Sequence, residues 1–435
     1  MSRFSSRFAL FMGLMLFLGG TMSGVFEVRR VEESGTIYIR ADGSIDPPDA
    51  PISTVDNVTY TLTGNITSDA DGIVVERDSI MVYGQGYTVQ GTGSGTGITL
   101  SGRSNVTIQN TEITAFSIGI WLNSSSNDTI SGNDVTANSW GGIKLENCLD
   151  INIVNNDITD NDLAGIWLFF SNSSLVSQNR ITRTPAGIIL DMSSSNTILE
   201  NDVRDNRENM VFEYSVNGGV ALSSHNRIFH NNFINGTWNA VTHFAGQPEN
   251  FWDDGYPSGG NYWSDYNGTD VNHDGIGDTS YVIDTKNADN YPLMGTFYEF
   301  TVPDGMLYNI ATVSNFTILD LYSLHELRID GPWYLVLEFT AVIPKGTVGF
   351  CRIDIPRVLI DGPYHVFTLG GNFTPTELPI SNSSHAFLYF TFDHSGPVII
   401  VPEFPSFLIL PLFFIATLLA VTVYRRKHAQ REWID

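Results

Sequence analysis

One four-residue pattern recurs through the middle of this 435-residue chain, as Gly119-Ile120-Trp121-Leu122, Gly142-Ile143-Lys144-Leu145, Gly165-Ile166-Trp167-Leu168 and Gly187-Ile188-Ile189-Leu190. These copies are 22 or 23 residues apart, and further copies begin at Gly72, Gly97 and Gly219. A repeat of this length is typical of a coil that buries its apolar side chains only when several coils stack.

A second element, Ile/Val-x-x-Asn-x-Ile/Val, lies between the copies and starts at Ile130, Ile153, Val176 and Ile198. Apolar residues alternate in both elements, which indicates two short strands per coil. The repeated amides are expected to stack and hydrogen-bond to one another; they belong to Asn133, Asn156, Asn179, Asn201 and Asn231. A leucine-rich repeat would need L-x-x-L-x-L, which is not seen. We therefore predict an all-β chain with a right-handed parallel β-helix over residues 35–297 and one inserted loop at residues 204–217.

The residue between the two apolar positions of the four-residue pattern faces outward, because successive side chains of a strand alternate between its two faces. Down the stack this position holds Trp121, Lys144 and Trp167. The two Trp residues would stand two strands apart, about 9.6 Å, on one face. Flat aromatic faces in such a row suit a glycan-binding surface, so these three residues form the candidate ligand site. The alternative is that another part of the chain covers this face.

A loop after the repeat has the ligand spacing of a calcium site. Asp270, Asn272, Asp274, Gly275 and Asp278 match positions 1, 3, 5, 6 and 9 of an EF-hand-type loop, and position 7 would add the backbone carbonyl of Ile276. Position 12 is a Tyr in place of the usual bidentate Glu, so weak, extracellular-type affinity is expected. We predict that these residues bind calcium, with a metal-free Asx turn as the alternative.

Beyond the repeat, residues 298–400 show short alternating runs separated by Gly, Pro and Asp, which predict a β-sandwich stalk domain. Residues 1–23 have the basic, apolar and small-residue regions of a secretory signal peptide. Residues 406–424 are uncharged and largely apolar, and Arg425-Arg426-Lys427 follows. We therefore predict a sorting or anchor motif with one C-terminal transmembrane helix over residues 401–427, and a cytoplasmic tail over residues 428–435.

The composition argues against two classes of partner. A formal net charge of −25 leaves no basic stripe for a phosphate backbone, so nucleic acid is not expected as a partner. Copper would need clustered His, Met or Cys, but the nine His are scattered and no CxxC, HxH or Met cluster appears. The two Cys, Cys148 and Cys351, fall in different predicted domains, so free thiols are expected. A copper site is therefore not expected from the residues themselves.

The recurring Asn-Asp-Val, Asn-Asp-Ile and Gly-Ile-x-Leu segments resemble right-handed parallel β-helix proteins of the NosD type, within the wider carbohydrate-binding and sugar-hydrolysis β-helix group. The most specific block runs from Gly259-Gly260-Asn261-Tyr262-Trp263 through Asp270–Asp278 to Tyr291-Pro292-Leu293, and is similar to the end of the β-helix in many archaeal surface proteins. Val401-Pro402-Glu403-Phe404-Pro405, with the apolar span and basic tail, resembles archaeal C-terminal sorting signals. NosD is linked to copper-site maturation, but a shared fold does not transfer that role.

We therefore expect a membrane-anchored cell-surface protein whose extracellular β-helix binds a glycan or another cell-surface polymer, or serves as a structural surface module. Its Asn-x-Ser/Thr sequons predict glycosylation in that location. The first alternative is a polysaccharide lyase or hydrolase, for which no focused pair of carboxylates stands out in the sequence. The second alternative is a NosD-type copper accessory protein.

Overall fold

The computed structural model describes residues 35–213, 223–242, 248–303, 307–327 and 334–402. Every element in these ranges is a β-strand, and within them no helix is long and apolar enough to cross a membrane. The predicted signal peptide, the apolar span at 406–424 and the cytoplasmic tail lie outside the described residues.

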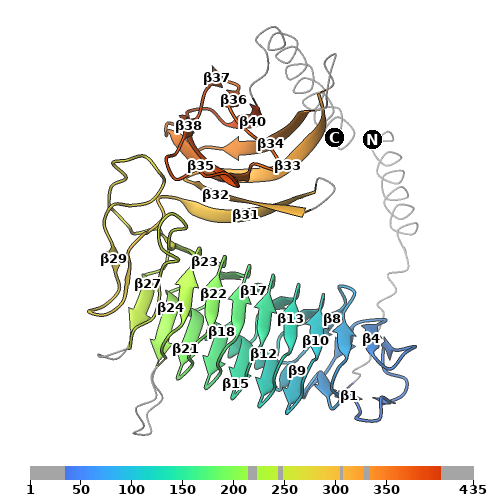
Figure 1. Ribbon diagram of the computed structural model, residues 1–435. Coiled ribbons are helices and arrows are strands. Elements are labelled where there is room, and N and C mark those ends of the chain that lie inside the picture. Colours follow the sequence, from blue (N-terminus) through green and yellow to red (C-terminus); the bar gives the residue numbers. More distant parts are fainter. Residues whose placement is uncertain (1–34, 214–222, 243–247, 304–306, 328–333, 403–435) are drawn as a thin grey trace, which may run out of the picture.

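The first domain is a parallel β-helix built from three sheets (Figure 1). Each regular coil contributes one strand to each sheet, and each strand pairs in parallel with its equivalent in the next coil. Sheet A contains, in spatial order, β2 (Ile45–Asp46), β1 (Ile37–Ile39), β6 (Ile73–Val75), β9 (Thr96–Ser101), β12 (Ile118–Asn123), β15 (Gly141–Glu146), β18 (Ala164–Phe169), β21 (Ala186–Asp191), β24 (Glu208–Glu213) and β27 (Trp238–Thr242).

The other two sheets are made of shorter strands. Sheet B contains β25 (Arg227–Phe229), β22 (Thr197–Leu199), β19 (Leu175–Ser177), β16 (Asn152–Val154), β13 (Thr129–Ser131), β10 (Thr107–Gln109), β7 (Met81–Tyr83), β4 (Thr59–Leu62) and β3 (Ile52–Ser53). Sheet C contains β28 (Tyr262–Trp263), β26 (Asn232–Ile234), β23 (Asp202–Arg204), β20 (Arg180–Thr182), β17 (Asp157–Thr159), β14 (Asp134–Thr136), β11 (Glu112–Thr114), β8 (Thr88–Gln90) and β5 (Ile66–Thr67).

The core of the β-helix follows directly from the four-residue pattern. Its two apolar positions are fully buried in register, and they hold Ile120, Ile143, Ile166 and Ile188 in one column and Leu122, Leu145, Leu168 and Leu190 in the other. The Gly that opens the pattern sits where coils approach most closely: a Cβ on Gly142 would lie 2.7 Å from the carbonyl oxygen of Gly165. Only Gly fits there, which explains why the pattern begins with it.

The Asn column forms the predicted ladder at the turn between sheets B and C. Each amide nitrogen donates to the side-chain oxygen of the next Asn, as in Asn133 to Asn156 at 3.0 Å and Asn179 to Asn201 at 3.0 Å. The ladder continues beyond the predicted residues to Asn261, which accepts from Asn231 at 2.9 Å. These side chains are buried, so the ladder satisfies polar groups that would otherwise be desolvated without partners.

The predicted insertion at residues 204–217 is placed too early in the chain. Residues 202–204 and 208–213 form β23 and β24, which pair with their neighbours as regular coil strands. The longer interval therefore begins only after Glu213, and residues 214–222 lie outside the described part of the chain. The repeat count locates an insertion only to within one interval, and here the regular strand pattern continues into that interval.

The C-terminal domain, residues 296–402, consists of two five-stranded antiparallel sheets over one apolar core. Sheet D contains β31 (Thr296–Pro303), β32 (Leu307–Ser314), β35 (Gly349–Pro356), β39 (His385–Phe392) and β38 (Thr376–Glu377). Sheet E contains β33 (Thr317–Leu327), β34 (Tyr334–Val342), β40 (Gly396–Pro402), β36 (Tyr364–Thr368) and β37 (Gly371–Phe373). A short hairpin, β29 (Tyr281–Val282) and β30 (Ala288–Asp289), lies between the two domains in the sequence.

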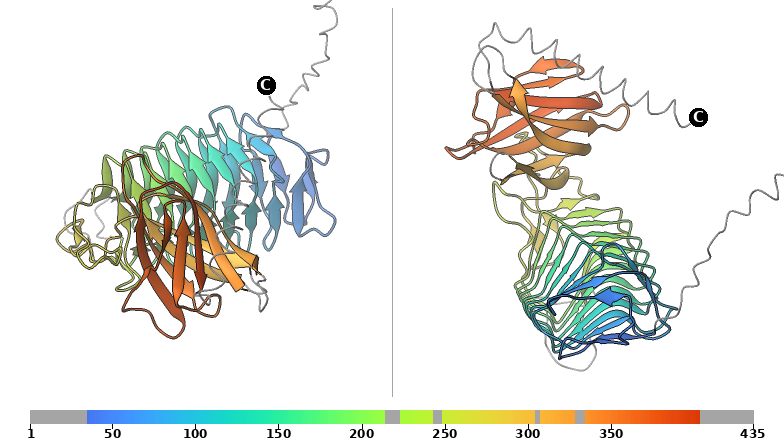
Figure 2. Two further views of the ribbon diagram at one scale, coloured as in Figure 1. Left: turned by 90° about the horizontal axis from the view of Figure 1, so that it is seen from above. Right: turned by 90° about the vertical axis from the view of Figure 1, so that its right-hand side faces the viewer.

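The C-terminal domain folds back over the coil stack and does not extend it (Figures 1 and 2). The side chain of Asn232 on β26 joins the two domains, because its Nδ2 donates to the carbonyl of Phe297 at 2.9 Å and its Oδ1 accepts from the Phe297 amide at 2.8 Å. Asn232 is buried at this junction. The first strand of the C-terminal domain is therefore fixed against the last coils.

Candidate functional site

The predicted outward row lies on sheet A. Trp121, Lys144 and Trp167 occupy equivalent positions of β12, β15 and β18, and neighbouring members are direct partners in the strand register. The residues on either side of Trp121, Ile120 and Leu122, point into the core and are fully buried. Alternation along the strand therefore places all three predicted side chains on the outer face of the coil stack.

An aromatic cluster, which we define as Trp140, Lys144, Trp167 and Phe169, forms around one end of this row. The Nζ of Lys144 lies 4.9 Å from the ring centroid of Trp140, 5.3 Å from that of Trp167 and 5.8 Å from that of Phe169. The two indole rings are 5.1 Å apart and tilted by 58°. This is cation–π geometry around a single ammonium group, and it gives the cluster a fixed shape.

Lys144 also forms an ion pair with Glu146, with 3.0 Å between Nζ and Oε2. The rings of the cluster are partly exposed, and neighbouring Phe170 is exposed. The indole Nε1 atoms of Trp121 and Trp167 are buried and have no hydrogen-bond partner among the described residues. Unpaired buried N–H groups are uncommon in folded proteins, so these two donors distinguish this face from an ordinary packed surface.

The exposed part of the face has a limit. Ile189 and Val211 occupy the next two positions of the same row, on β21 and β24, and both are buried. The surface available to a ligand therefore lies over β12, β15 and β18 and does not include the whole row.

Two members of the cluster were missed by sequence reasoning. Phe169 is the second outward residue of β18, so the alternation that predicted Trp167 also predicts it. Trp140 precedes β15 in a turn, where strand alternation says nothing about side-chain direction. Trp121 lies two strands from Trp167, as predicted, with the strand that carries Lys144 between them.

The residues of the predicted calcium loop hold the loop together through its own backbone. Asp270 accepts from the backbone amides of Asp274 at 3.0 Å and Gly275 at 2.9 Å. Asp274 accepts from the amide of Ile276 at 2.9 Å and from Asn272 Nδ2 at 3.0 Å. These contacts form a compact Asx-type loop with its carboxylates close to the chain.

Asp278 closes the other side of this loop, because its Oδ2 accepts from the amide of Val271 at 2.7 Å. Among the described residues, no three His, Cys, Asp or Glu side chains gather closely enough to hold a metal ion. The loop also packs on the C-terminal domain: a Cβ on Gly275 would lie 3.2 Å from Arg352. Calcium binding at Asp270, Asn272, Asp274, Ile276 and Asp278 therefore remains a prediction.

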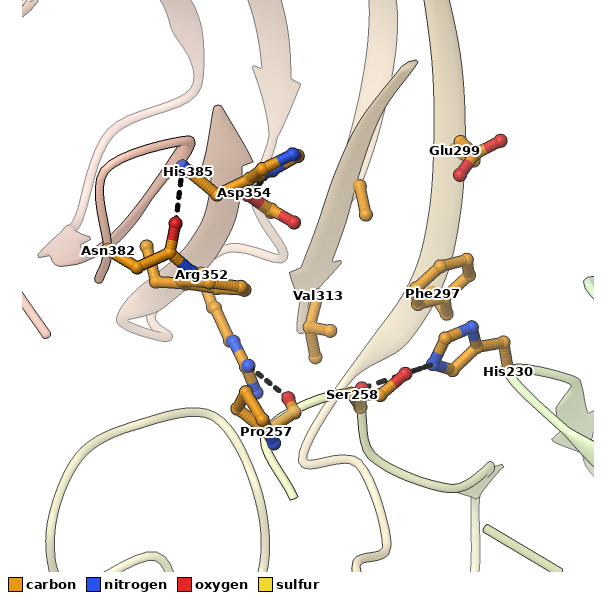
Figure 3. Close-up of a pocket in the computed structure, with 12 residues that line it drawn as sticks. His230, Pro257, Ser258, Phe297, Glu299, Val313, Arg352, Asp354, Asn382 and His385 are labelled. Atoms are coloured by element: carbon orange, nitrogen blue, oxygen red, sulfur yellow. Dashed lines mark hydrogen bonds and ion pairs between the residues drawn. The ribbon is translucent and has the colours of Figure 1, made fainter. Parts of the chain in front are cut away.

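A pocket of about 410 Å³ opens between the last coils and the outer face of sheet D (Figure 3). His230 and Ser258 line it from the β-helix side, and Glu299, Asp354 and His385 line it from the C-terminal domain. Sequence reasoning could not find it, because its walls come from two domains and its floor depends on strand register.

The C-terminal domain carries most of the charge of this pocket. His385 Nδ1 lies 2.8 Å from Asp354 Oδ1. Burial raises the pKa of Asp354, while the His385 partner acts in the opposite direction. Arg352 is almost fully buried beneath the pocket, and burial lowers the pKa of its guanidinium.

Comparison with known proteins gives one family match. Residues 49–218 match the family model described as "Periplasmic copper-binding protein (NosD)". This range covers the coils from β3 to β24, in agreement with the NosD-type resemblance of the repeats, and ends before the Gly259–Leu293 block. No curated protein matches the chain.

Several solved structures are similar at low identity. The crystal structure of the periplasmic alginate epimerase AlgG has a TM-score of 0.38 and 18% identity, over 43% of this chain and 50% of that chain. Pectate lyase Pel9A has a TM-score of 0.32 and 14% identity, over 43% of this chain and 57% of that chain. The Dettilon tailspike protein (gp208) has a TM-score of 0.32 and 10% identity, over 84% of each chain. This chain thus spans half of the epimerase and 57% of the lyase, and these similarities assign no activity to it.

The family description names copper, but the matched residues do not supply a copper donor set. Residues 49–218 contain no His, and their single Cys, Cys148, is buried. Their three Met residues lie in three different coils: Met81, Met192 and Met210. The Cys148 thiol lies within hydrogen-bond distance of the Leu122 and Glu146 carbonyls, and burial raises its pKa, which disfavours the thiolate that binds metal.

Proposed function

We propose that this chain is a cell-surface β-helix protein that binds glycans through the aromatic cluster of sheet A. The observation that carries the proposal is the grouping of Trp140, Trp167 and Phe169 around Lys144 on the outer face of adjacent coils. Aromatic rings offer apolar area to the C–H faces of a sugar, and they do so with little loss of side-chain entropy.

The polar members of the site complement these rings. Lys144 donates hydrogen bonds and Glu146 accepts them, so the pair offers both functions to sugar hydroxyls next to the apolar surface. Charge-assisted hydrogen bonds of this kind fix orientation more strongly than neutral ones. Because the rings of Trp140 and Trp167 are tilted, the surface is angular and not a flat stacking platform. An angular surface favours contact with one particular face of a sugar chain.

The parallel coils suit an extended polymer as ligand. Equivalent positions recur from coil to coil, so Trp121 and Trp167 stand about 9.6 Å apart along the stack axis. A polysaccharide that lies along this axis would contact both rings and pass over Lys144. We propose this orientation for the bound glycan.

The surface location rests on the two ends of the chain. The apolar span at 406–424, followed by Arg425-Arg426-Lys427, supports an anchor with a cytoplasmic tail. With the signal peptide, this arrangement places the β-helix outside the membrane, and the C-terminal domain then serves as a spacer between the membrane and the β-helix.

The test of this function is a glycan-array screen of the purified full-length protein. We expect binding to at least one polysaccharide class, with the signal lost in Trp167→Ala and in Lys144→Ala. Trp238→Ala is the matched control, because Trp238 is an exposed Trp on β27 of the same sheet and lies outside the cluster. Equal loss of signal in Trp238→Ala and Trp167→Ala would contradict a specific site.

A further inference from the structure

The pocket between the two domains has a floor that strand register defines. Glu299 on β31, Ala311 on β32, Asp354 on β35 and Phe387 on β39 are successive cross-strand partners, so they form one row on one face of sheet D. Ala311 is the small member of the row. Its short side chain leaves a hollow between Glu299 and Asp354, whose Cα atoms stand about 9.6 Å apart across two strand spacings.

The two carboxylates of this row are only partly engaged. Glu299 Oε1 accepts from Asn309 Nδ2 at 2.8 Å, and Asp354 Oδ1 lies 2.8 Å from His385 Nδ1. Among the described residues, Glu299 Oε2 and Asp354 Oδ2 have no partner. Two acceptor oxygens therefore remain for a ligand on opposite sides of the hollow. Figure 3 shows the side chains of Glu299 and Asp354 in the upper part of the pocket view.

The opposite wall is apolar and uncharged. The His230 ring stacks on Phe297 with centroids 4.0 Å apart and 12° between the planes. His230 Nε2 lies 3.1 Å from the Ser258 carbonyl, and burial lowers the His230 pKa to about 4, so the ring is neutral at physiological pH. This wall offers ring surface and no positive charge that would attract an anion.

Arg352 also lines this pocket and places a guanidinium near Asp354. It is 4% exposed, its Nη2 donates to the carbonyl of Pro257, and its guanidinium lies 5.4 Å from the Phe387 ring centroid. The Nη1 atom is buried and has no hydrogen-bond partner among the described residues. The polar groups at the hollow are therefore the two carboxylates, His385 and Arg352, next to the rings of His230 and Phe387.

We propose that this pocket binds an uncharged sugar residue, with Glu299 and Asp354 accepting hydrogen bonds from its hydroxyl groups. Hydroxyls are the donors that two unengaged carboxylate oxygens select, and the resulting charge-assisted bonds are strong. A volume of about 410 Å³ at a domain interface is in the usual range and place for a small ligand. A sugar that carries a carboxylate is repelled by the same two groups.

This proposal deepens the glycan-binding function, since it concerns the same class of ligand, but it rests on different residues. The two surfaces are distinguishable by mutation. Ala311→Leu fills the hollow and keeps every polar group, whereas Trp167→Ala alters only the outer face of sheet A. Glu299→Gln removes the charge of an exposed side chain at the pocket mouth without disturbing the core.

The experiment is ligand-observed NMR saturation transfer on the full-length protein. The probes are the methyl glycosides of glucose, galactose, mannose and N-acetylglucosamine, with glucuronic acid as the charged counterpart. We expect saturation transfer to at least one neutral glycoside and none to glucuronic acid. The signal persists in Trp167→Ala, which removes the outer site. In that background, adding Ala311→Leu abolishes the signal and adding Glu299→Gln weakens the affinity about tenfold.

The controls separate the outcomes. Thr391→Ala changes an exposed residue on the same face of sheet D, on β39 and outside the pocket, and its signal should equal that of the wild type. If Ala311→Leu does not fold, Glu299→Gln alone decides the question. A signal that Trp167→Ala abolishes and both pocket variants keep would overturn the pocket and leave the outer site standing. In Trp167→Ala, equal transfer to glucuronic acid, or no transfer to any neutral glycoside, would also overturn it.

Discussion

Asn156 donates from its Nδ2 to Oδ1 of Asn179, one coil further along the stack, at 2.9 Å. Its own Oδ1 accepts from both the amide and the side chain of Asn133 at 3.0 Å, and its Nδ2 also donates to the Ile130 carbonyl at 2.9 Å. Each rung of the ladder thus satisfies groups of the coils before and after it. The ladder couples neighbouring coils through polar contacts inside the stack.

Replacing Asn156 with Ala should destabilise the β-helix by about 2–4 kcal/mol, because it leaves several buried polar groups without partners. Asn152 is exposed on β16 of the same coil, so the free energy of unfolding of Asn152→Ala should stay within about 0.5 kcal/mol of the wild-type value. Chemical denaturation of both variants checks this expectation. Equal stabilities would show that water or rearranged neighbours replace the ladder bonds.

A second prediction concerns pH. Asp128 accepts from the Val106 amide at 2.7 Å with Oδ1, while its buried Oδ2 has no partner among the described residues. Burial raises the pKa of this carboxyl to about 7. The folded protein therefore keeps a proton that the unfolded chain releases near pH 4, so wild-type stability should fall as pH rises from about 4 through 7.

Asp128→Asn should remove this loss, because Asn carries no charge. Asn also fits this position: Asn196 and Asn226 precede β22 and β25 as Asp128 precedes β13, and their side chains hydrogen-bond to each other at 3.0 Å. Its melting temperature should exceed that of the wild type by more at pH 8 than at pH 5, with a difference of about 2–4 °C. Asp49→Asn, at an exposed position, serves as the control. A difference that does not vary with pH would mean that Asp128 is already ionised in the folded state.

Calcium should stabilise the loop between the domains. Asp270, Asn272 and Asp274 follow the spacing of a calcium loop, and a cation bound only by the folded loop raises stability by mass action. We expect millimolar calcium to raise the melting temperature, Asp274→Ala to remove the increase, and Asp69→Asn, at an exposed position in an early coil, to keep it. An identical melting temperature in calcium and in chelator would identify the loop as a metal-free turn.

The proposed topology predicts the result of protease treatment on intact cells. The β-helix should be digested, while an epitope tag placed after Asp435 should be protected, because the basic residues after the apolar span keep that end inside. Truncation before Ser406 should release the protein into the medium. Protection of the β-helix, or digestion of the tag, would rule out this orientation.

The coil fold could be predicted from the sequence because each coil repeats the same residue types at the same structural positions. The Ile and Leu of the four-residue pattern, the Gly at the close approach and the Asn of the ladder each recur once per coil, so the period reveals them. Strand alternation likewise places Trp121, Lys144 and Trp167 on the outer face.

Features without a period could not be predicted in this way. Trp140 joins the cluster from a turn, and the row of Glu299, Ala311 and Asp354 depends on the pairing of strands that are distant in sequence. The Asn232–Phe297 contact joins residues 65 positions apart with no local signal. The loop at Asp270 differs from these features because its residue spacing is recognisable in the sequence. The spacing alone does not predict that the Asp270 side chain accepts a hydrogen bond from the loop backbone.

The most direct test of the account is the affinity of the full-length protein for the polysaccharide selected on the array, measured by isothermal titration for the wild type, Trp167→Ala and Trp238→Ala. Loss of a central aromatic contact should weaken binding at least tenfold, or about 1.4 kcal/mol, in Trp167→Ala. Trp238→Ala should bind as the wild type does. A dissociation constant for Trp167→Ala within about twofold of the wild type would contradict glycan binding at the aromatic cluster.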